Sequence, residues 1–189
     1  MSSVTWKEDT IMGTIKIPAP VKFFVAVLFE DRQVYDRVYP RLEKEFGSVQ
    51  WVSPDIDFTQ TDYYREIGEK LNRVFIVFQD LIDPGGLADR KIMTNHIESQ
   101  TGNAQNSRKI NLDPGYFDGG KIVLATTKNF SHRVYIGKGV YAEATIRWEK
   151  GDFRPFEYTY PDYASQEYRP SLIQIRILYR ESLSHSQSI

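Results

Sequence analysis

The chain has 189 residues, with 24 Lys and Arg against 25 Asp and Glu, so its formal net charge is −1. A protein that coats nucleic acid needs a basic surplus to neutralise phosphates, and this composition excludes such a general coat. The absence of cysteine excludes disulfides, thiolate zinc sites and a cysteine nucleophile.

The length predicts one domain with a core of its own, and a hydrophobic content of 41% favours a folded globular chain. The first twenty residues lack the basic head and apolar stretch of a secretory signal. No apolar run reaches the ~18 residues that a transmembrane helix needs. We therefore expect a cytoplasmic protein with no membrane partner.

The predicted elements begin after a flexible N-terminal tail at residues 1–19. Residues 21–30 are a continuous apolar run, VKFFVAVLFE, which predicts a strand that is buried on both faces. Apolar residues then recur every four positions and predict an amphipathic helix that ends at Gly47. These apolar residues are Val34, Val38, Leu42 and Phe46.

Four further elements are predicted before the centre of the chain. Residues 48–58 favour a strand that is broken at its proline, and residues 63–71 favour a short helix. Residues 73–79 predict another buried strand, and residues 87–99 place their apolar side chains on one helical face. A polar stretch at residues 100–109 predicts a loop.

The sequence DPGY at residues 113–116 predicts a tight turn. Proline presets φ at the second position of a turn, and Gly115 permits a positive φ at the third. Asp113 can then accept hydrogen bonds from the amides of the turn. The functional alternative is that the turn presents Asp113 and Tyr116 to a ligand.

The last elements follow this predicted turn. Residues 121–127 predict a third buried strand, and residues 132–150 predict a hairpin that turns at Gly137-Lys138-Gly139. Residues 169–183 predict a helix with proline in its first turn, although the alternating isoleucines also suit a strand. The remaining residues, 184–189, are expected to be disordered.

This order of elements predicts a single α+β domain over residues 20–183. We expect a mainly antiparallel sheet with a ferredoxin-like β-α-β core, an added β-hairpin and helices mostly on one face.

Basic residues cluster between positions 121 and 138, although the chain as a whole is balanced. If the two strands around this cluster are neighbours, Lys128, His132 and Arg133 converge near one connection. Such a group can hold a phosphate or carboxylate through charge-assisted hydrogen bonds. The alternative is a solvated basic rim that protects a sheet edge from pairing.

We predict Asp113 and His132 as candidate catalytic residues, because imidazole can exchange protons near neutral pH. The candidate ligand-binding residues are Lys121, Lys128, Arg133, Lys138, Tyr116 and Tyr141. A single histidine is more often structural, and cross-strand aromatic and charge pairs stabilise hairpins by themselves. The loop YTYPDY, residues 158–163, favours a lid, a stacking surface or plain packing on the sheet.

Several familiar signatures are absent from the sequence. There is no phosphate-binding G-x-x-x-x-G-K-[ST] loop, no dinucleotide fingerprint and no G-x-S-x-G nucleophile elbow. The three histidines are far apart and show no zinc-binding spacing, so no metal site is predicted. A magnesium site needs only one or two carboxylates plus substrate and stays open, and no cofactor is indicated.

Six segments resemble a bacterial family, the domain of unknown function 4416 family. They are PVKFFVAVLF, FTQTDYY, LIDPGGLADRKIMTN, NLDPGY, KIVLATTKNFSHRVYIGKGVYAE and TYPDY. The resemblance spans Pro20 to Leu183, with Asn129 where an aspartate is expected. Members are sometimes labelled GTP-binding proteins, but this chain has neither a P-loop nor an N-K-x-D motif, and the resemblance implies no catalytic residue.

Two functions are compatible with these observations, and whether the protein is an enzyme stays open. The first is a cytoplasmic protein that binds a phosphorylated small molecule, a nucleotide or an RNA segment at the local basic site. The second is a non-catalytic protein–protein interaction module with a tyrosine-rich surface.

Overall fold

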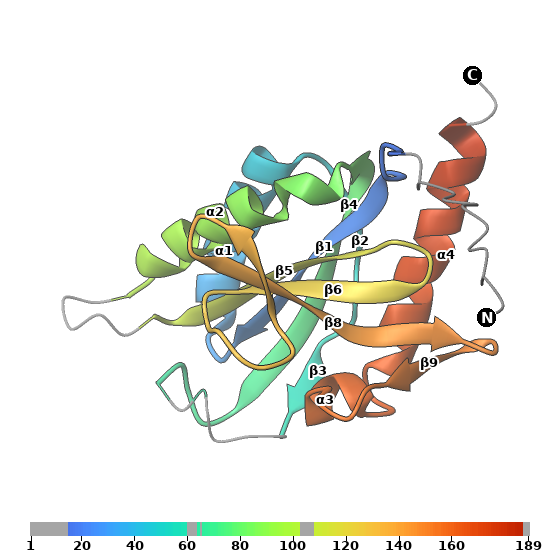
Figure 1. Cartoon of the computed structure of the whole chain (residues 1–189). Coiled ribbons are helices and arrows are strands. Elements are labelled where there is room, and N and C mark those ends of the chain that lie inside the picture. The colour runs from blue at the N-terminus through green and yellow to red at the C-terminus, as the bar shows by residue number, and fades with distance from the viewer. Residues whose placement is uncertain (1–14, 60–63, 65, 103–107, 187–189) are drawn as a thin grey trace, which may run out of the picture.

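The structure is a computed structural model that describes residues 15–59, 64, 66–102 and 108–186. One sheet of nine strands forms its centre, and every pair of neighbouring strands is antiparallel (Figure 1). Helices pack against this sheet, so the predicted α+β class is confirmed. In the described part of the chain, every helix is too short or too polar to cross a lipid bilayer.

The first half of the chain builds the predicted ferredoxin-like core. Its elements are β1 (Val21–Phe29), α1 (Arg32–Phe46), β2 (Val49–Val52), β4 (Leu71–Ile82), α2 (Leu87–Ser99) and β5 (Ile110–Phe117). The short 3₁₀ helix Pro84–Gly86 precedes α2. These strands take the order β2-β4-β1-β5 in the sheet, which is the β-α-β-β-α-β arrangement of ferredoxin-like domains.

Strand β1 lies at the centre of this core, and all nine of its residues are buried. Its odd-numbered side chains, such as Phe23 and Val25, pack with apolar residues of α1 and α2. Its even-numbered side chains, such as Phe24 and Ala26, face the opposite layer. Alternate side chains of a strand point to opposite faces, so a strand covered on both sides needs an unbroken apolar run.

The second half of the chain widens the sheet beyond β5. It contributes β6 (Lys121–Thr126), β7 (Val134–Gly137), β8 (Val140–Glu149), β9 (Asp152–Pro155), α3 (Pro161–Ala164) and α4 (Arg169–Ser186). The sheet continues in the order β5-β6-β8-β7, while β9 pairs with β8 and the short β3 (Ile56–Phe58) pairs with β4.

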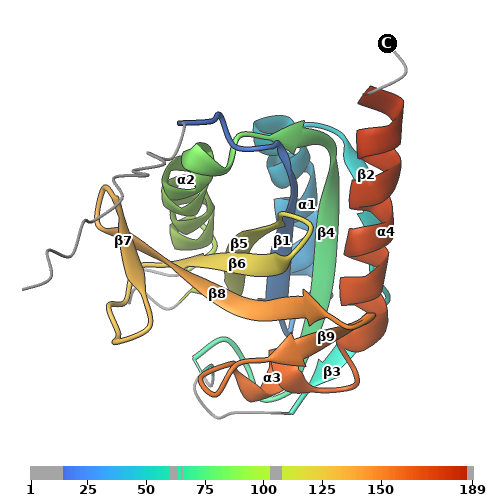
Figure 2. The same cartoon turned by 45° about the vertical axis from the view of Figure 1, so that its right-hand side comes forward.

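Helix α4 covers the face of the sheet that α1 and α2 leave open (Figure 2). Leu172, Ile175 and Leu178 are buried there, whereas Ile173 and Ile177 stay partly exposed. The isoleucine alternation therefore belongs to a helix, which continues through Ser186. The expectation of helices mostly on one face holds for α1 and α2 but not for α4, because alternate side chains of β1 and β4 make the second face of the sheet apolar as well.

The DPGY segment is not a turn, and that prediction is wrong. Asp113 and Gly115 lie within β5 and pair with Ala26 and Phe24 of β1. A Cβ on Gly115 would lie 2.6 Å from Leu124 Cδ2 and 2.7 Å from the Val123 carbonyl oxygen, so glycine here permits a close approach of β6.

Pairing between β5 and β6 covers only a short stretch. It runs from Phe117 to Gly115 and stops before Pro114, which has no amide hydrogen to donate. The two strands diverge beyond that point. The reversal between them lies instead at Asp118, whose side chain accepts hydrogen bonds from the Gly120 and Lys121 amides.

The predicted hairpin is confirmed in β7 and β8. Lys138 and Gly139 form a two-residue turn in which both residues have positive φ, at 55° and 76°. Strand β6 pairs with β8 rather than with β7. The connection from β6 to β7, residues 127–133, therefore has to cross β8.

Two predicted segments fall partly outside the described residues. Residues 1–14 of the predicted tail lie outside them, and residues 15–20 precede β1 without regular structure. Within the predicted helix at residues 63–71, residues 66–67 form a turn and residues 69–70 form a bend. The amides of Glu69 and Lys70 donate to the Glu30 carboxylate, which takes the place of helical bonds.

Candidate ligand-binding pocket

A pocket of about 840 Å³ lies where β5 and β6 diverge. Side chains from β4, β5, α2, β6, β8 and the segment around α3 line it, together with the connection at residues 127–133. Five of its described lining residues are Lys or Arg and three are Asp or Glu, so the pocket wall carries a net positive charge. The chain as a whole has a formal net charge of −1.

The side chain of Arg73 on β4 organises the floor of the pocket and is only 1% exposed. Its Nε donates to the Tyr168 hydroxyl at 3.0 Å, and its Nη1 donates to Asp113 Oδ2 at 3.3 Å. Its Nη2 lies 3.6 Å from Asp162 Oδ2. Burial raises the pKa of Asp162, although Arg73 opposes that shift. The guanidinium thus joins β4, β5, α3 and the segment before α4.

Two charged side chains of α2 form hydrogen bonds with the part of β5 that β6 leaves unpaired. Lys91 Nζ donates to the Leu112 carbonyl at 2.9 Å, and Glu98 Oε1 accepts from the Leu112 amide at 2.6 Å. Burial raises the pKa of Glu98, while Lys91 and the Leu112 amide oppose it. These side chains supply the bonds that a neighbouring strand would otherwise make, so the sheet stays open here.

A second row of polar side chains connects this edge with the floor. Arg108 Nη1 donates to Glu98 Oε2 at 3.1 Å and to Asn111 Oδ1 at 2.7 Å. Asn111 Nδ2 donates to Asp113 Oδ2 at 2.6 Å. The charges of the floor are therefore largely compensated by one another.

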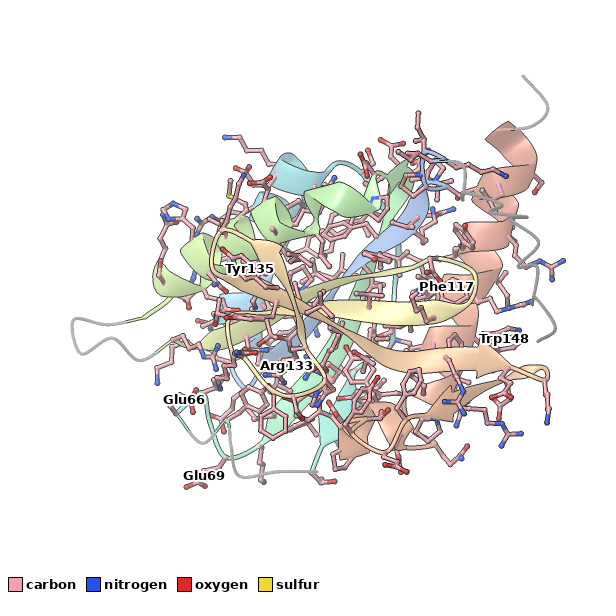
Figure 3. The ribbon with its side chains drawn as sticks, in the orientation of Figure 1. Glu66, Glu69, Phe117, Arg133, Tyr135 and Trp148 are labelled. Atoms are coloured by element: carbon pink, nitrogen blue, oxygen red, sulfur yellow. The ribbon has the colours of Figure 1, made fainter. Side chains whose placement is uncertain are left out.

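The connection at residues 127–133 forms the rim of the pocket. Arg133 is held by three hydrogen bonds: Nε to Glu143 Oε2 at 2.7 Å, Nη1 to the Lys128 carbonyl at 2.9 Å, and Nη2 to the Tyr160 hydroxyl at 2.6 Å. Figure 3 shows Arg133 beside this connection. The buried Glu143 of β8 thereby fixes the guanidinium beneath the connection.

His132 shares the Glu143 carboxylate with Arg133. Its Nε2 lies 3.1 Å from Glu143 Oε2, and its ring stacks on Tyr158 with centroids 4.1 Å apart and an interplanar angle of 9°. The ring of Tyr158 stacks in turn on Phe156, at 5.3 Å and 5°. Three parallel rings therefore start at the rim of the pocket.

Lys128 is the second cation of the rim. Burial lowers the pKa of its ammonium, and the charge of Arg133 lowers it further. The two side chains therefore repel each other at one end of the pocket. An anion placed between them would remove that repulsion.

The structure brings some of the predicted site residues together and separates others. Asp113, Lys128, His132 and Arg133 all line the pocket. Four others are not among its described lining residues: Lys121, Lys138, Tyr116 and Tyr141.

Each of these four side chains has another setting. Lys121 pairs with Asp118 at the far end of β6, and Lys138 pairs with Asp89 at the start of α2. Tyr116 packs in an apolar cluster with residues of α2, and Tyr141 contacts the ring of Tyr135 on the hairpin.

The sequence interpretation missed several residues of the pocket. Arg73 opens a buried apolar run, and Lys91 lies on the buried side of α2 with Leu87 and Ile97. A charge inside an apolar pattern was the available signal for both. The loop YTYPDY, which the sequence left undecided, contributes Tyr158, Tyr160, Asp162 and Tyr163.

Among the described residues, no group of three or more His, Asp or Glu side chains is arranged to hold a metal ion. The sequence model of one family, described as domain of unknown function (DUF4416), matches residues 19–179. The chain therefore belongs to this family. No curated protein and no solved structure matches it.

Proposed function

We propose that this DUF4416 protein acts in the cytoplasm and binds an anionic, phosphorylated ligand in the pocket between β5 and β6. The ligand is a phosphorylated small molecule, a nucleotide or the terminal nucleotide of an RNA segment. The observation that carries the proposal is the pair formed by Lys128 and Arg133, two mutually repelling cations at the rim of a net-positive pocket.

The hydrogen-bonding capacity of Arg133 supports this proposal. A guanidinium has five N–H donors in a planar fork. Three bonds among the described residues use one donor on each nitrogen. The remaining two, together with the Lys128 ammonium, can donate to phosphate oxygens in charge-assisted hydrogen bonds.

The aromatic side chains of the rim favour a ligand that also carries a planar ring. The ring of His132 continues the stack of Tyr158 and Phe156 toward the pocket. The ring centroids of Phe130 and His132 are 5.3 Å apart, and Phe130 is 64% exposed. Nucleobases stack on such surfaces with little sequence preference.

The two candidate catalytic residues take different parts in this proposal. Asp113 accepts from Arg73 and Asn111, so it shapes the pocket floor. His132 is oriented by Glu143 through Nε2 and stands next to the proposed phosphate site. It is the candidate for proton transfer if the bound ligand reacts.

The proposal is tested by titrating the protein with inorganic phosphate, nucleoside mono- and triphosphates and a 5′-phosphorylated RNA oligonucleotide. Ligand at about 100 times its dissociation constant stabilises a protein by ~2.7 kcal/mol, which a thermal-shift assay detects. Lys128→Ala should weaken binding about tenfold. Lys138→Ala is the matched control and should leave binding unchanged, because Lys138 pairs with Asp89 outside the pocket. Equal binding by both variants would overturn the proposal.

A protein-interaction module is the second candidate, and the edge strand β7 favours it. Val134 and Tyr135 of this strand are 68% and 59% exposed. Exposed apolar side chains on an edge strand are typical of surfaces that contact another protein. Co-purification of one protein that is lost in Val134→Asp, together with no response to any anion, would favour this candidate.

A further inference from the structure

The floor of the pocket contains a buried hydroxyl that no described residue satisfies. Tyr163 lines the pocket, is only 3% exposed, and its hydroxyl has no hydrogen-bond partner among the described residues. A buried polar group without a partner costs roughly 1–3 kcal/mol, so such groups usually bond to an ordered water, an ion or a ligand.

The ring of Tyr163 is fixed by its neighbours. The rings of Phe75 and Tyr168 contact it edge-on, with ring centroids 6.1 Å and 5.5 Å from its own. All three rings belong to the core beneath α4. The tyrosine therefore cannot turn its hydroxyl into solvent without disturbing that core. Burial raises the pKa of Tyr163 far above its ordinary value, so the hydroxyl stays neutral and able to donate.

Two carboxylates, those of Asp113 and Asp162, line the same pocket as Tyr163. Arg73 lines this pocket as well, and all three charged groups act electrostatically on Tyr163. Each carboxylate offers about four lone-pair sites. Asp113 Oδ2 accepts from Arg73 and Asn111, whereas its Oδ1 lies 3.9 Å from Lys91, beyond hydrogen-bond distance.

A second anion would not suit this end of the pocket, since two carboxylates already face it. A neutral group that both donates and accepts does suit it, such as a pair of sugar hydroxyls or the polar edge of a base. It can donate to Asp113 or Asp162 and accept from Tyr163.

We infer that the pocket is polarised and takes a phosphomonoester with a neutral, hydroxyl- or amide-bearing end. Lys128 and Arg133 hold the phosphate at the rim, and Tyr163 with the two floor aspartates holds the neutral end. A nucleoside monophosphate or a sugar phosphate has this chemistry, whereas inorganic phosphate has only half of it. The inference rests on the proposed function and narrows its ligand class.

The test compares Tyr163→Phe with the wild-type protein by isothermal titration calorimetry. The probes are inorganic phosphate, ribose 5-phosphate and the four ribonucleoside 5′-monophosphates. Tyr163→Phe should bind the tightest organic probe about tenfold more weakly and bind inorganic phosphate within twofold of wild type. Its melting temperature should not fall, because the lost hydroxyl has no partner in the described residues.

Tyr179→Phe is the matched control. Its hydroxyl lies 3.4 Å from the Asp118 carbonyl oxygen, and Tyr179 is not among the described lining residues of the pocket. This control should bind every probe as the wild type does.

Three outcomes would overturn the inference. Unchanged affinity of Tyr163→Phe for the organic probe would overturn the inference alone, and so would an equal loss for that probe and for phosphate. If the wild type binds neither phosphate nor any phosphomonoester, the proposed function fails as well.

Discussion

The floor and the rim of the pocket carry similar residue types in different arrangements. At the floor, the Arg73 guanidinium lies between the carboxylates of Asp113 and Asp162. The Lys91 ammonium donates to the Leu112 carbonyl of β5, so both cations have acceptors. At the rim, Lys128 stands beside Arg133 and feels its positive charge. The floor comes from core strands and helices, whereas the rim comes mainly from one connection.

The floor and the rim therefore differ in what their charged side chains contribute, which is fold stability at the floor and ligand binding at the rim. A compensated buried network contributes to the stability of the fold, and removing one member leaves other charges unpaired. At the rim, Arg133 is paired with Glu143, but its charge still disfavours the Lys128 ammonium, so this end of the pocket favours an added anion. Substitutions at the floor should therefore act first on folding, and substitution of Lys128 at the rim should act first on binding.

The largest effect is expected for Arg73→Met. This change removes the cation that is buried between Asp113 and Asp162 and leaves both carboxylates without it. We expect the free energy of unfolding to fall by about 3–5 kcal/mol in urea titrations. Arg147→Met is the control, since Arg147 pairs with Glu149 at the surface and should cost below ~1 kcal/mol. Equal losses in the two variants would contradict a structural floor.

A smaller loss is expected where β6 approaches β5 beside the pocket. Gly115→Ala places a methyl group against Leu124 and the Val123 carbonyl, so unfolding should become easier by roughly 1–3 kcal/mol. Gly120→Ala serves as the control, because the nearest atom to its Cβ would be 3.7 Å away. If Gly115→Ala is as stable as Gly120→Ala, the close approach of the two strands is not what selects glycine.

A still smaller effect is expected from two carboxylates, Asp162 and Asp118, whose contributions to the free energy of unfolding should change with pH in opposite directions. Burial raises the pKa of Asp162, so the folded state holds its proton more tightly than the unfolded state. Its contribution to stability therefore falls as pH rises above the ordinary value of ~3.9 through the raised one. Burial would also raise the pKa of Asp118, but hydrogen bonds from Lys121 and the Gly120 amide outweigh it and lower the pKa.

Asp118 therefore contributes stability above pH ~3.9 that is lost as pH falls through its lowered pKa. The measurement is the difference in unfolding free energy between wild type and each Asn variant across pH 2–8. The difference should grow with pH for Asp118→Asn and shrink with pH for Asp162→Asn. Curves of the same sign would contradict the contrast between these sites.

The smallest effect on stability is expected for Lys128→Ala. Removing one of two neighbouring cations should change the free energy of unfolding by no more than ~0.5 kcal/mol, even though ligand binding weakens. Urea titration without ligand measures this directly. A loss comparable with that of Arg73→Met would mean that the rim, like the floor, is structural.

The parts predicted correctly from sequence are those fixed by local pattern. The buried strand β1 follows from an unbroken apolar run, and the hairpin turn follows from residues that adopt positive φ. Lys128, His132 and Arg133 were grouped correctly because one short connection carries all three.

The parts that sequence could not give depend on contacts between distant elements. Arg73 reaches Asp162 only after β4 and α3 are packed, and Lys91 of α2 approaches Asp113 only after α2 is packed on β5. The residues Asp113-Pro114-Gly115 suit a tight turn, and they equally suit a strand whose pairing with its neighbour stops at the proline. Only the position of β6 decides between the two. Lys121 and Lys138 carry the right charge, but Lys121 begins β6 beside Asp118 and Lys138 lies in the hairpin turn beside Asp89.

The most direct test of the central claim is an amide chemical-shift titration of the ¹⁵N-labelled protein with adenosine or guanosine 5′-monophosphate. We expect saturable shifts within residues 124–133 and 158–163, two segments that contribute most of the rim and part of the floor. The turn at residues 118–121 and the hairpin tip at residues 137–139 should stay unchanged. Shifts confined to those two turns, or no saturable shift at all, would contradict a phosphate-binding pocket between β5 and β6.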